Sequence, residues 1–239
     1  MTSLLTNPYL RSWSRRFHLI KILSVLHGRW KLWRGIDYEE SFWNALQQCV
    51  RPGDVVWDVG ANVGHYSTRL ASVVGESGKV AVFEPFPATA EILKKAIAGF
   101  PNIHLFNFGL GDEDKKHDVP VDGQSETNSL VRHAGGRASS GALVSIQVRC
   151  GDAVLNEHPD IAPNIIKIDV EGYEEEVLTG LSKTLQGRDL RGIFIEVHFG
   201  ILEQKGQRHA PLRICDLLVR NGFKVTWTDY SHIQAIAAR

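Results

Sequence analysis

The stretch "VVWDVGANVGHYS", residues 55–67, joins an apolar run to a turn of small residues. The run contains Asp58, and Gly60, Asn62 and Gly64 follow at alternate positions. This turn is a poor match to the G-x-G-x-x-G turn of dinucleotide-binding proteins, and the sequence has no G-x-x-x-x-G-K-[ST] phosphate loop. It fits G-x-G-x-G, because asparagine is among the few residues that tolerate a positive φ. The turn therefore predicts a close backbone approach to a nucleoside-type ligand without pyrophosphate.

Apolar runs alternate with helical patterns from residue 50 onward. The expected strands are 54–60, 79–85, 102–111, 143–150, 164–172, 192–199, 223–229 and 232–238, and the expected helices are 65–75, 88–100, 173–185 and 212–222. Buried strands separated by helices predict an α/β fold with a doubly wound, mostly parallel sheet. Only Tyr230 and Ser231 separate the last two strands, so these are expected to form an antiparallel hairpin.

The composition excludes several classes of protein. The formal net charge of the 239 residues is zero, so nothing in the overall charge indicates a nucleic-acid partner. No apolar run is long enough to span a bilayer. The cysteines, Cys49, Cys150 and Cys215, are far apart and odd in number, which argues against a disulfide framework or a zinc site. We therefore expect a protein of a reducing compartment, the cytoplasm.

The first 36 residues differ from the rest in charge, because they carry seven basic residues and no acidic one. Apolar residues recur there at helical spacing, with Leu10, Trp13, Phe17 and Ile20 on one face. One interpretation is a helix that packs on the domain with its basic side in water. The other is an arm that contacts a membrane surface or binds substrate. We assign residues 1–40 to this basic helical extension and 41–239 to the main domain.

Two acidic residues come at the ends of successive expected strands. Glu84 ends the second strand, and a carboxylate at this place can accept hydrogen bonds from both hydroxyls of a ribose. Asp58 can face an ammonium group, and the N–H groups of the turn can face a carboxylate. S-adenosylmethionine fits this pattern, because it carries an amino acid on its ribose. The alternative for each acid is that it caps a loop or pairs with a surface base.

Six motifs carry a resemblance to a known family. They are "VVWDVGANVGHYS", "VAVFEPFP", "NFGLGDEDK", "SETNSL", "IIKIDVEGYEEEVLTG" and "IFIEVH", and they cover about residues 50–200. The sequence resembles the FkbM family of S-adenosylmethionine-dependent methyltransferases. The resemblance implies that 41–239 form a class I methyltransferase domain with a Rossmann-like, seven-stranded sheet. It also implies methyl transfer to oxygen, typically a hydroxyl of a sugar, glycan or natural product.

The resemblance also implies roles for residues near the cofactor. It places Asp58, Gly60, Asn62 and Gly64 in the first cofactor loop, Glu84 on the ribose, and Gly111 and Asp112 near the adenine. It places Asn128 and Ser129 in a small polar loop over cofactor or substrate, for which an ordinary surface loop is the alternative.

Three residues are candidates for the general base that an alcohol acceptor requires. Asp169, Glu171 and His198 lie at the ends of neighbouring expected strands, and Asp169 is the best placed for a methyl group. Alternatively, Asp169 orients the cofactor, Glu171 pairs with Lys167 or caps a helix, and His198 is a packed residue. Asp169 and Glu171 could begin a metal site, but the sequence indicates no third ligand. We therefore expect an enzyme without a metal.

Two other classes of function remain open at this point. One is a nucleotide-binding oxidoreductase, which the first turn disfavours. The other is a noncatalytic cofactor-binding subunit that docks through its N-terminal arm. Acids at three strand ends disfavour this second alternative, since a scaffold has no use for them.

Overall fold

The computed structural model describes residues 38–120 and 143–238. The extension 1–36 and the pair Asn128 and Ser129 therefore lie outside the described residues. In chain order the elements are α4 (Tyr38–Cys49), β1 (Val55–Val59), α5 (His65–Val74), β2 (Lys79–Phe83), α6 (Pro87–Ala96), β3 (Ile103–Phe106), β4 (Gly109–Gly111), β5 (Lys115–Pro120), β6 (Leu143–Cys150), α7 (Gly151–Glu157), β7 (Ile165–Ile168), α8 (Glu174–Thr179), β8 (Gly192–Glu196), α9 (Phe199–Gln204), α10 (Ala210–Arg220), β9 (Phe223–Trp227) and β10 (His232–Ala237), with short 3₁₀ turns at Pro159–Ile161 and Thr184–Gln186.

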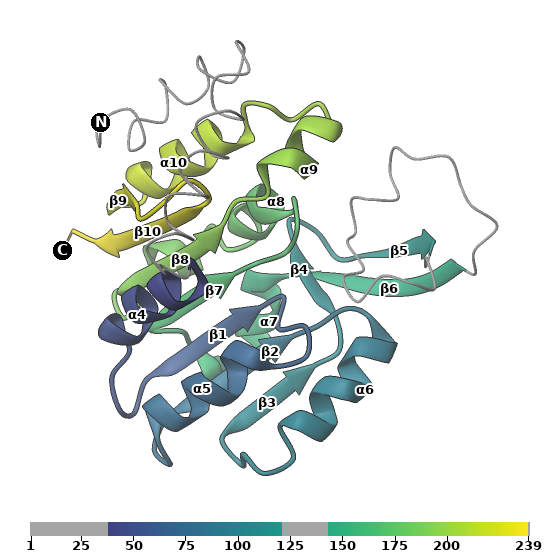
Figure 1. Ribbon diagram of the computed structural model, residues 1–239, viewed down its shortest axis with the longest axis vertical. Coiled ribbons are helices and arrows are strands. Elements are labelled where there is room, and N and C mark those ends of the chain that lie inside the picture. The colour runs from purple at the N-terminus through teal and green to yellow at the C-terminus, as the bar shows by residue number, and fades with distance from the viewer. Residues whose placement is uncertain (1–37, 121–142, 239) are drawn as a thin grey trace, which may run out of the picture.

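A seven-stranded sheet forms the centre of the molecule, in the order β3-β2-β1-β7-β8-β10-β9 (Figure 1). The first five strands in this order, β3, β2, β1, β7 and β8, are parallel to one another. Strand β10 is antiparallel to both of its neighbours, β8 and β9. The doubly wound, mostly parallel sheet and the terminal hairpin are thereby confirmed. Because the parallel strands end at the same edge, the residues that follow β1, β2, β7 and β8 come together there.

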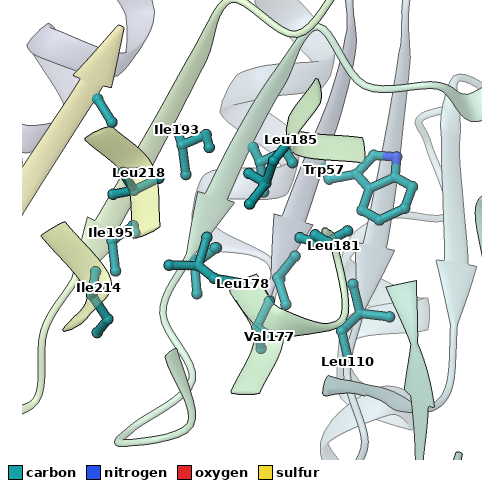
Figure 2. Packing of buried hydrophobic residues seen from close by; sticks show 14 of the residues in the cluster. Trp57, Leu110, Val177, Leu178, Leu181, Leu185, Ile193, Ile195, Ile214 and Leu218 are labelled. Carbon is teal, nitrogen blue, oxygen red and sulfur yellow. The ribbon is translucent and has the colours of Figure 1, made fainter. Parts of the chain in front are cut away.

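Each face of the sheet packs into its own apolar cluster, since successive side chains of a strand point to opposite faces. Trp57, Ile166 and Ile195 belong to the cluster beneath α8 and α10, part of which Figure 2 shows. Val56 and Ile165 belong to the cluster on the other face, which includes residues of α4, α5 and α6. The same alternation carries the polar side chains of β1, β7 and β8 to this second face.

The run 102–111 does not form one strand, and that prediction is wrong. The chain leaves the main sheet after β3, and Asn107 donates a hydrogen bond from Nδ2 to the Glu84 backbone oxygen at 2.8 Å. The following β4 joins a second, three-stranded sheet in the order β4-β6-β5, which projects to one side (Figure 1). The predicted strand 143–150 is confirmed as β6, while β5 was not predicted from its polar sequence.

The predicted helix 173–185 is shorter in the structure, because α8 ends at Thr179. A Cβ at the next residue, Gly180, would lie 1.8 Å from the backbone oxygen of Gly111. The backbone of β4 thus packs directly against the end of α8.

Near the start of the described chain, the predicted domain boundary after residue 40 falls inside α4, whose Phe42 and Leu46 are buried in the core. Among the described helices, none has the length and apolar character needed to cross a membrane.

Candidate active site

The turn between β1 and α5 holds three residues in the left-handed backbone region. Gly60 has φ +78°, Asn62 +50° and Gly64 +89°, so the expected tolerance of Asn62 for a positive φ is confirmed. A Cβ at Gly60 would lie 1.9 Å from the backbone oxygen of Asp169. The N–H of Gly60 also donates to the backbone oxygen of Phe83 at 3.0 Å. The turn is therefore fixed against both neighbouring strands.

Glu84 follows β2 and closes one side of the turn. Its carboxylate is buried and accepts hydrogen bonds from the backbone N–H of Asn62 at 3.0 Å and of Phe86 at 2.9 Å. Burial raises the pKa of Glu84 to about 7, although the two N–H donors oppose this shift. A carboxyl group that faces the turn in this way can accept hydrogen bonds from vicinal hydroxyls.

Asp58 lies beneath the turn and has internal partners. Its side chain is 0% exposed, and its Oδ2 accepts a hydrogen bond from the Ser67 hydroxyl at 2.6 Å. Its Oδ1 lies 2.9 Å from the Nζ of Lys167, which is 2% exposed and donates to the backbone oxygen of Gly60 at 3.2 Å. The Asp58–Lys167 pair thus supports the turn from below, and contact between Asp58 and a cofactor ammonium stays a prediction.

Asp169, directly after β7, lies between two basic groups. Lys167 Nζ is 3.5 Å from its Oδ2, and His198 Nε2 is 3.6 Å from its Oδ1. The side chain keeps 29% of its surface exposed. Loss of water raises the pKa of Asp169, and the Lys167 ammonium opposes this shift. The structure thus brings Asp169 and His198 together at the strand ends, and their catalytic roles stay predictions.

His198 is oriented by a carboxylate that the sequence did not single out. Its Nδ1 lies 2.9 Å from Oε1 of Glu174, whose side chain is fully buried at the start of α8. Burial alone would lower the pKa of His198, but Glu174 and Asp169 together raise it to about 9. At neutral pH the imidazole is therefore protonated.

A second histidine pair lies next to this one. Glu196, the last residue of β8, has its Oε2 3.6 Å from Nε2 of His232, whose Nδ1 is 2.7 Å from Oδ2 of Asp229. Burial lowers the pKa of His232, but Asp229 and Glu196 raise it to about 9. Burial would raise the pKa of Glu196, yet His232 holds it below its ordinary value.

A cavity of about 230 Å³ connects the turn with these acidic groups. Predicted site residues in its lining are Gly60, Asn62, Glu84, Asp169, Glu171 and His198. The lining also contains three residues with a hydroxyl or carboxyl group that were not predicted, namely Thr89, Tyr173 and Glu196. One cavity thus holds both the proposed cofactor turn and the candidate bases.

The remaining predicted residues of the described chain lie outside the cavity lining. Gly64 precedes α5, and a Cβ there would lie 2.6 Å from Leu93 Cδ1. A Cβ at Gly111 would lie 2.9 Å from the ring of Tyr173, a lining residue. Asp112 is exposed and lies 3.4 Å from Lys115 Nζ. Their proposed closeness to an adenine stays a prediction.

Comparison with known proteins agrees with this geometry. The model of the methyltransferase FkbM domain family matches residues 58–225. The chain belongs to this family. The match begins at Asp58 in β1 and ends in β9, so it includes every residue of the cavity lining. Membership in a methyltransferase family decides against the oxidoreductase alternative.

Two curated relatives cover similar shares of the chain. Hexuronic acid methyltransferase AglP of Haloferax volcanii is 27% identical over 174 residues, which are 72% of this chain and 68% of the relative. AMB antimetabolite synthetase AmbE of Pseudomonas aeruginosa is 26% identical over 209 residues, which cover 73% of this chain but only 10% of that protein.

Solved structures share the fold of this FkbM-family chain. Methyltransferase FkbM of Methylobacillus flagellatus superimposes with a TM-score of 0.53 at 16% identity, over 81% of this chain and 50% of that one. A Streptococcus mutans protein solved in complex with SAH superimposes with a TM-score of 0.51 at 12% identity, over 84% of this chain and 98% of that one. At these identities the likeness establishes the fold.

Sequence reasoning missed Glu196 and Glu174, although the sequence held a signal for one of them. Glu196 precedes His198 by two residues at the end of an expected strand, and side chains two apart on a strand share a face. Glu174 carried no such signal, since its contact with His198 depends on how α8 docks against β8. Lys167 was expected as a partner for Glu171 and as a neighbour of Asp169; its ion pairs are with Asp169 and with Asp58, which was not expected.

Proposed function

We propose that this FkbM-family methyltransferase transfers the methyl group of S-adenosylmethionine to a hydroxyl oxygen of a sugar, glycan or related natural product. The observation that carries the proposal is the single cavity shared by the turn, Glu84 and Asp169. A ligand held by the turn and Glu84 would have its reactive group toward the ends of β7 and β8. The hexuronic acid named in the Haloferax volcanii relative supports a sugar acceptor.

The cofactor would lie across the carboxyl ends of β1 and β2. Glu84 would accept hydrogen bonds from its ribose hydroxyls. The N–H groups of the turn were expected to face its carboxylate, but those of Gly60, Ala61, Asn62 and Gly64 already donate within the chain, so the turn would meet the cofactor by close backbone approach. Gly111 and Asp112 would lie on the adenine side, and Asp58 would act on the amino group. S-adenosylmethionine supplies an activated methyl group on a sulfonium, so alignment of the acceptor and exclusion of water provide much of the rate.

The chain's own residues would handle the proton of the acceptor. As the new O–CH₃ bond forms and the S–CH₃ bond breaks, the hydroxyl proton passes to the Asp169 carboxylate and later to solvent. The products are the methyl ether and S-adenosylhomocysteine (SAH). His198 is protonated at neutral pH, so it would orient Asp169 rather than take the proton. Glu171, at φ +50° beside the cavity, would contact the acceptor.

The test is a methyl-transfer screen with radiolabelled S-adenosylmethionine. Uronic acids, their neutral sugar counterparts and small hydroxylated natural products would be offered in parallel. Once an acceptor is found, Asp169→Asn should bind SAH within a few-fold of the wild type and lose roughly 10²–10⁴ in turnover, the usual worth of a general base. The matched control is Asp216→Asn on the exposed face of α10, which should retain turnover.

Two outcomes would contradict the proposal. Absence of calorimetric binding by both S-adenosylmethionine and SAH would remove the cofactor assignment. Tight cofactor binding with no transfer to any acceptor class would favour the noncatalytic subunit. Near-normal turnover of Asp169→Asn would leave the enzyme in place and move the base to another residue.

A further inference from the structure

Three side chains with metal-ligating atoms converge where β7 and β8 end. Asp169, Glu196 and His198 each offer one such atom, and the three atoms lie within 4.8 Å of one another. The sequence led us to expect no metal, because Asp169 and Glu171 lacked a third partner. The structure supplies two partners for Asp169: Glu196, the last residue of β8, and His198, two residues after this strand, which lies next to β7 in the sheet.

We propose that Asp169, Glu196 and His198 form a binding site for a divalent metal ion. Two carboxylate oxygens and one imidazole nitrogen are a ligand set that suits Mn²⁺, Fe²⁺ or Zn²⁺ and leaves coordination positions open. The ion would displace the proton from Nε2 of His198, while Nδ1 keeps its hydrogen bond to Glu174. Two ligand atoms on one ion lie at most about 4.4 Å apart, twice a bond of about 2.2 Å. The observed separations therefore require only small side-chain movements.

Two of the three ligands, Asp169 and His198, are each held by an outer residue through an atom other than the one that faces the cluster. Lys167 lies at Oδ2 of Asp169, while Oδ1 faces His198. The buried Glu174 binds Nδ1 of His198, so Nε2 faces Asp169. Outer partners that fix the orientation and tautomer of metal ligands are characteristic of metal sites, histidine–carboxylate pairs above all.

The charge of the cavity also favours a cation. Among the described residues that line it, four are carboxylates and one is basic, namely Glu84, Asp169, Glu171 and Glu196 against His198. The ammonium of Lys167 lies outside this lining. This ammonium also pairs with the Asp58 carboxylate, 2.9 Å away, and the negative charge of Asp58 weakens its repulsion of an ion at Asp169.

This site would deepen the proposed function, on which its catalytic meaning rests. An ion held there would leave positions for the acceptor oxygen and would lower the pKa of the bound hydroxyl. The ion would also place that oxygen at the end of β7, opposite the turn that is proposed to hold the cofactor. Asp169 would then act through the ion as well as on the proton.

The experiment measures metal binding without any acceptor. The full chain, treated with EDTA and then freed of it, is titrated with Mn²⁺, and free Mn²⁺ is followed by electron paramagnetic resonance. Binding of one Mn²⁺ per chain is expected, with competition by Zn²⁺. Glu196→Gln and Asp169→Asn should each weaken Mn²⁺ binding by tenfold or more. Glu91→Gln, on the exposed side of α6, is the matched control and should not change it.

SAH calorimetry on the same preparations separates the possible failures. A chain that binds SAH but shows no saturable Mn²⁺ binding at millimolar concentration overturns the metal site and leaves the methyltransferase proposal intact. Mn²⁺ binding that is equal in wild type, Glu196→Gln and Asp169→Asn also overturns it, because the ion then sits elsewhere. Saturable Mn²⁺ binding that these two variants lose supports the site, whether or not SAH binds.

Discussion

Replacing Lys167 with methionine should destabilise the protein strongly, and the loss should depend on pH. Methionine has a similar length but no charge, so it would leave Asp58 without its 2.9 Å partner in a place that is 0% exposed. Removing one member of a buried ion pair typically costs about 3–5 kcal/mol. The carboxylate can escape this cost by taking up a proton, which for an ordinary aspartic acid costs about 4 kcal/mol at pH 7. The two figures agree, so we expect a loss of about 3–4 kcal/mol in the free energy of unfolding.

The pH dependence identifies the cause. The cost of protonating an aspartic acid falls by about 1.4 kcal/mol for each pH unit below 7, so the difference between wild type and Lys167→Met should shrink toward pH 5. Urea unfolding at pH 5, 6 and 7 measures it. The double variant Asp58→Asn with Lys167→Met should recover most of the loss. Lys224→Met, on an exposed position of β9, is the control and should stay within about 0.5 kcal/mol of wild type.

A loss below 1 kcal/mol at pH 7 would refute the reasoning. So would a loss that is the same at pH 5 and pH 7, since that result would mean that packing rather than the unpaired charge of Asp58 sets the cost.

Three other predictions concern the turn, the cofactor and the histidines. Gly60→Ala should lose at least about 3 kcal/mol in the free energy of unfolding measured in urea, because its Cβ would meet the backbone of Asp169. The control Gly206→Ala, with φ +72° and open space around its Cβ, should lose only the about 1–2 kcal/mol that a left-handed backbone costs, and equal losses in the two variants would contradict the clash. Glu84→Gln should weaken SAH binding by about 1.5–3 kcal/mol in calorimetry. The affinity of the wild-type protein for SAH should rise from pH 6 to 8 as the Glu84 carboxyl, with a pKa of about 7, ionises, and an affinity that does not change with pH would count against ribose binding by this carboxylate. The pKa of His232 in the folded protein is raised to about 9, so the protonated imidazole should stabilise the folded state by about 3 kcal/mol below pH 6.5 and lose this effect as the pH rises to 9. The melting temperatures of wild type and His232→Gln should therefore converge between pH 6.5 and 9, and a constant difference between them would contradict the prediction.

The structure gives a second reason for the glycine at position 60. From the sequence, this turn was expected to bring its backbone close to a nucleoside-type ligand. The structure shows that the first carbon of any side chain already meets the backbone after β7. Even alanine is therefore expected to be costly, before any ligand is present.

The main sheet was predictable because its central strands, β1, β2, β7 and β8, are short, apolar and buried on both faces. The run "IIKI" shows this, since all four side chains of β7 are buried, the lysine included. The second sheet was not predictable, since "NIHLFNFGLG" has no break in its apolar pattern at the place where the chain changes sheets. That break depends on Asn107, whose side chain binds the backbone of Glu84.

The candidate site was partly predictable for the same reason. Residues that directly follow a parallel strand, such as Glu84 and Asp169, must lie at one edge of the sheet. Residues that reach the site from a helix or a hairpin, such as Glu174 and His232, do so only through tertiary packing. The sequence pattern around them carries no mark of that contact.

The end of the antiparallel β5–β6 pair in the second sheet has a practical use. Pro120, the last residue of β5, is paired with Leu143, the first residue of β6, so the chain leaves and re-enters the described structure at neighbouring backbone positions. A reporter domain whose own termini lie close together can therefore be spliced in at this point while both strands keep their register. The end of the β5–β6 pair is thus a candidate domain-insertion site for protein engineering.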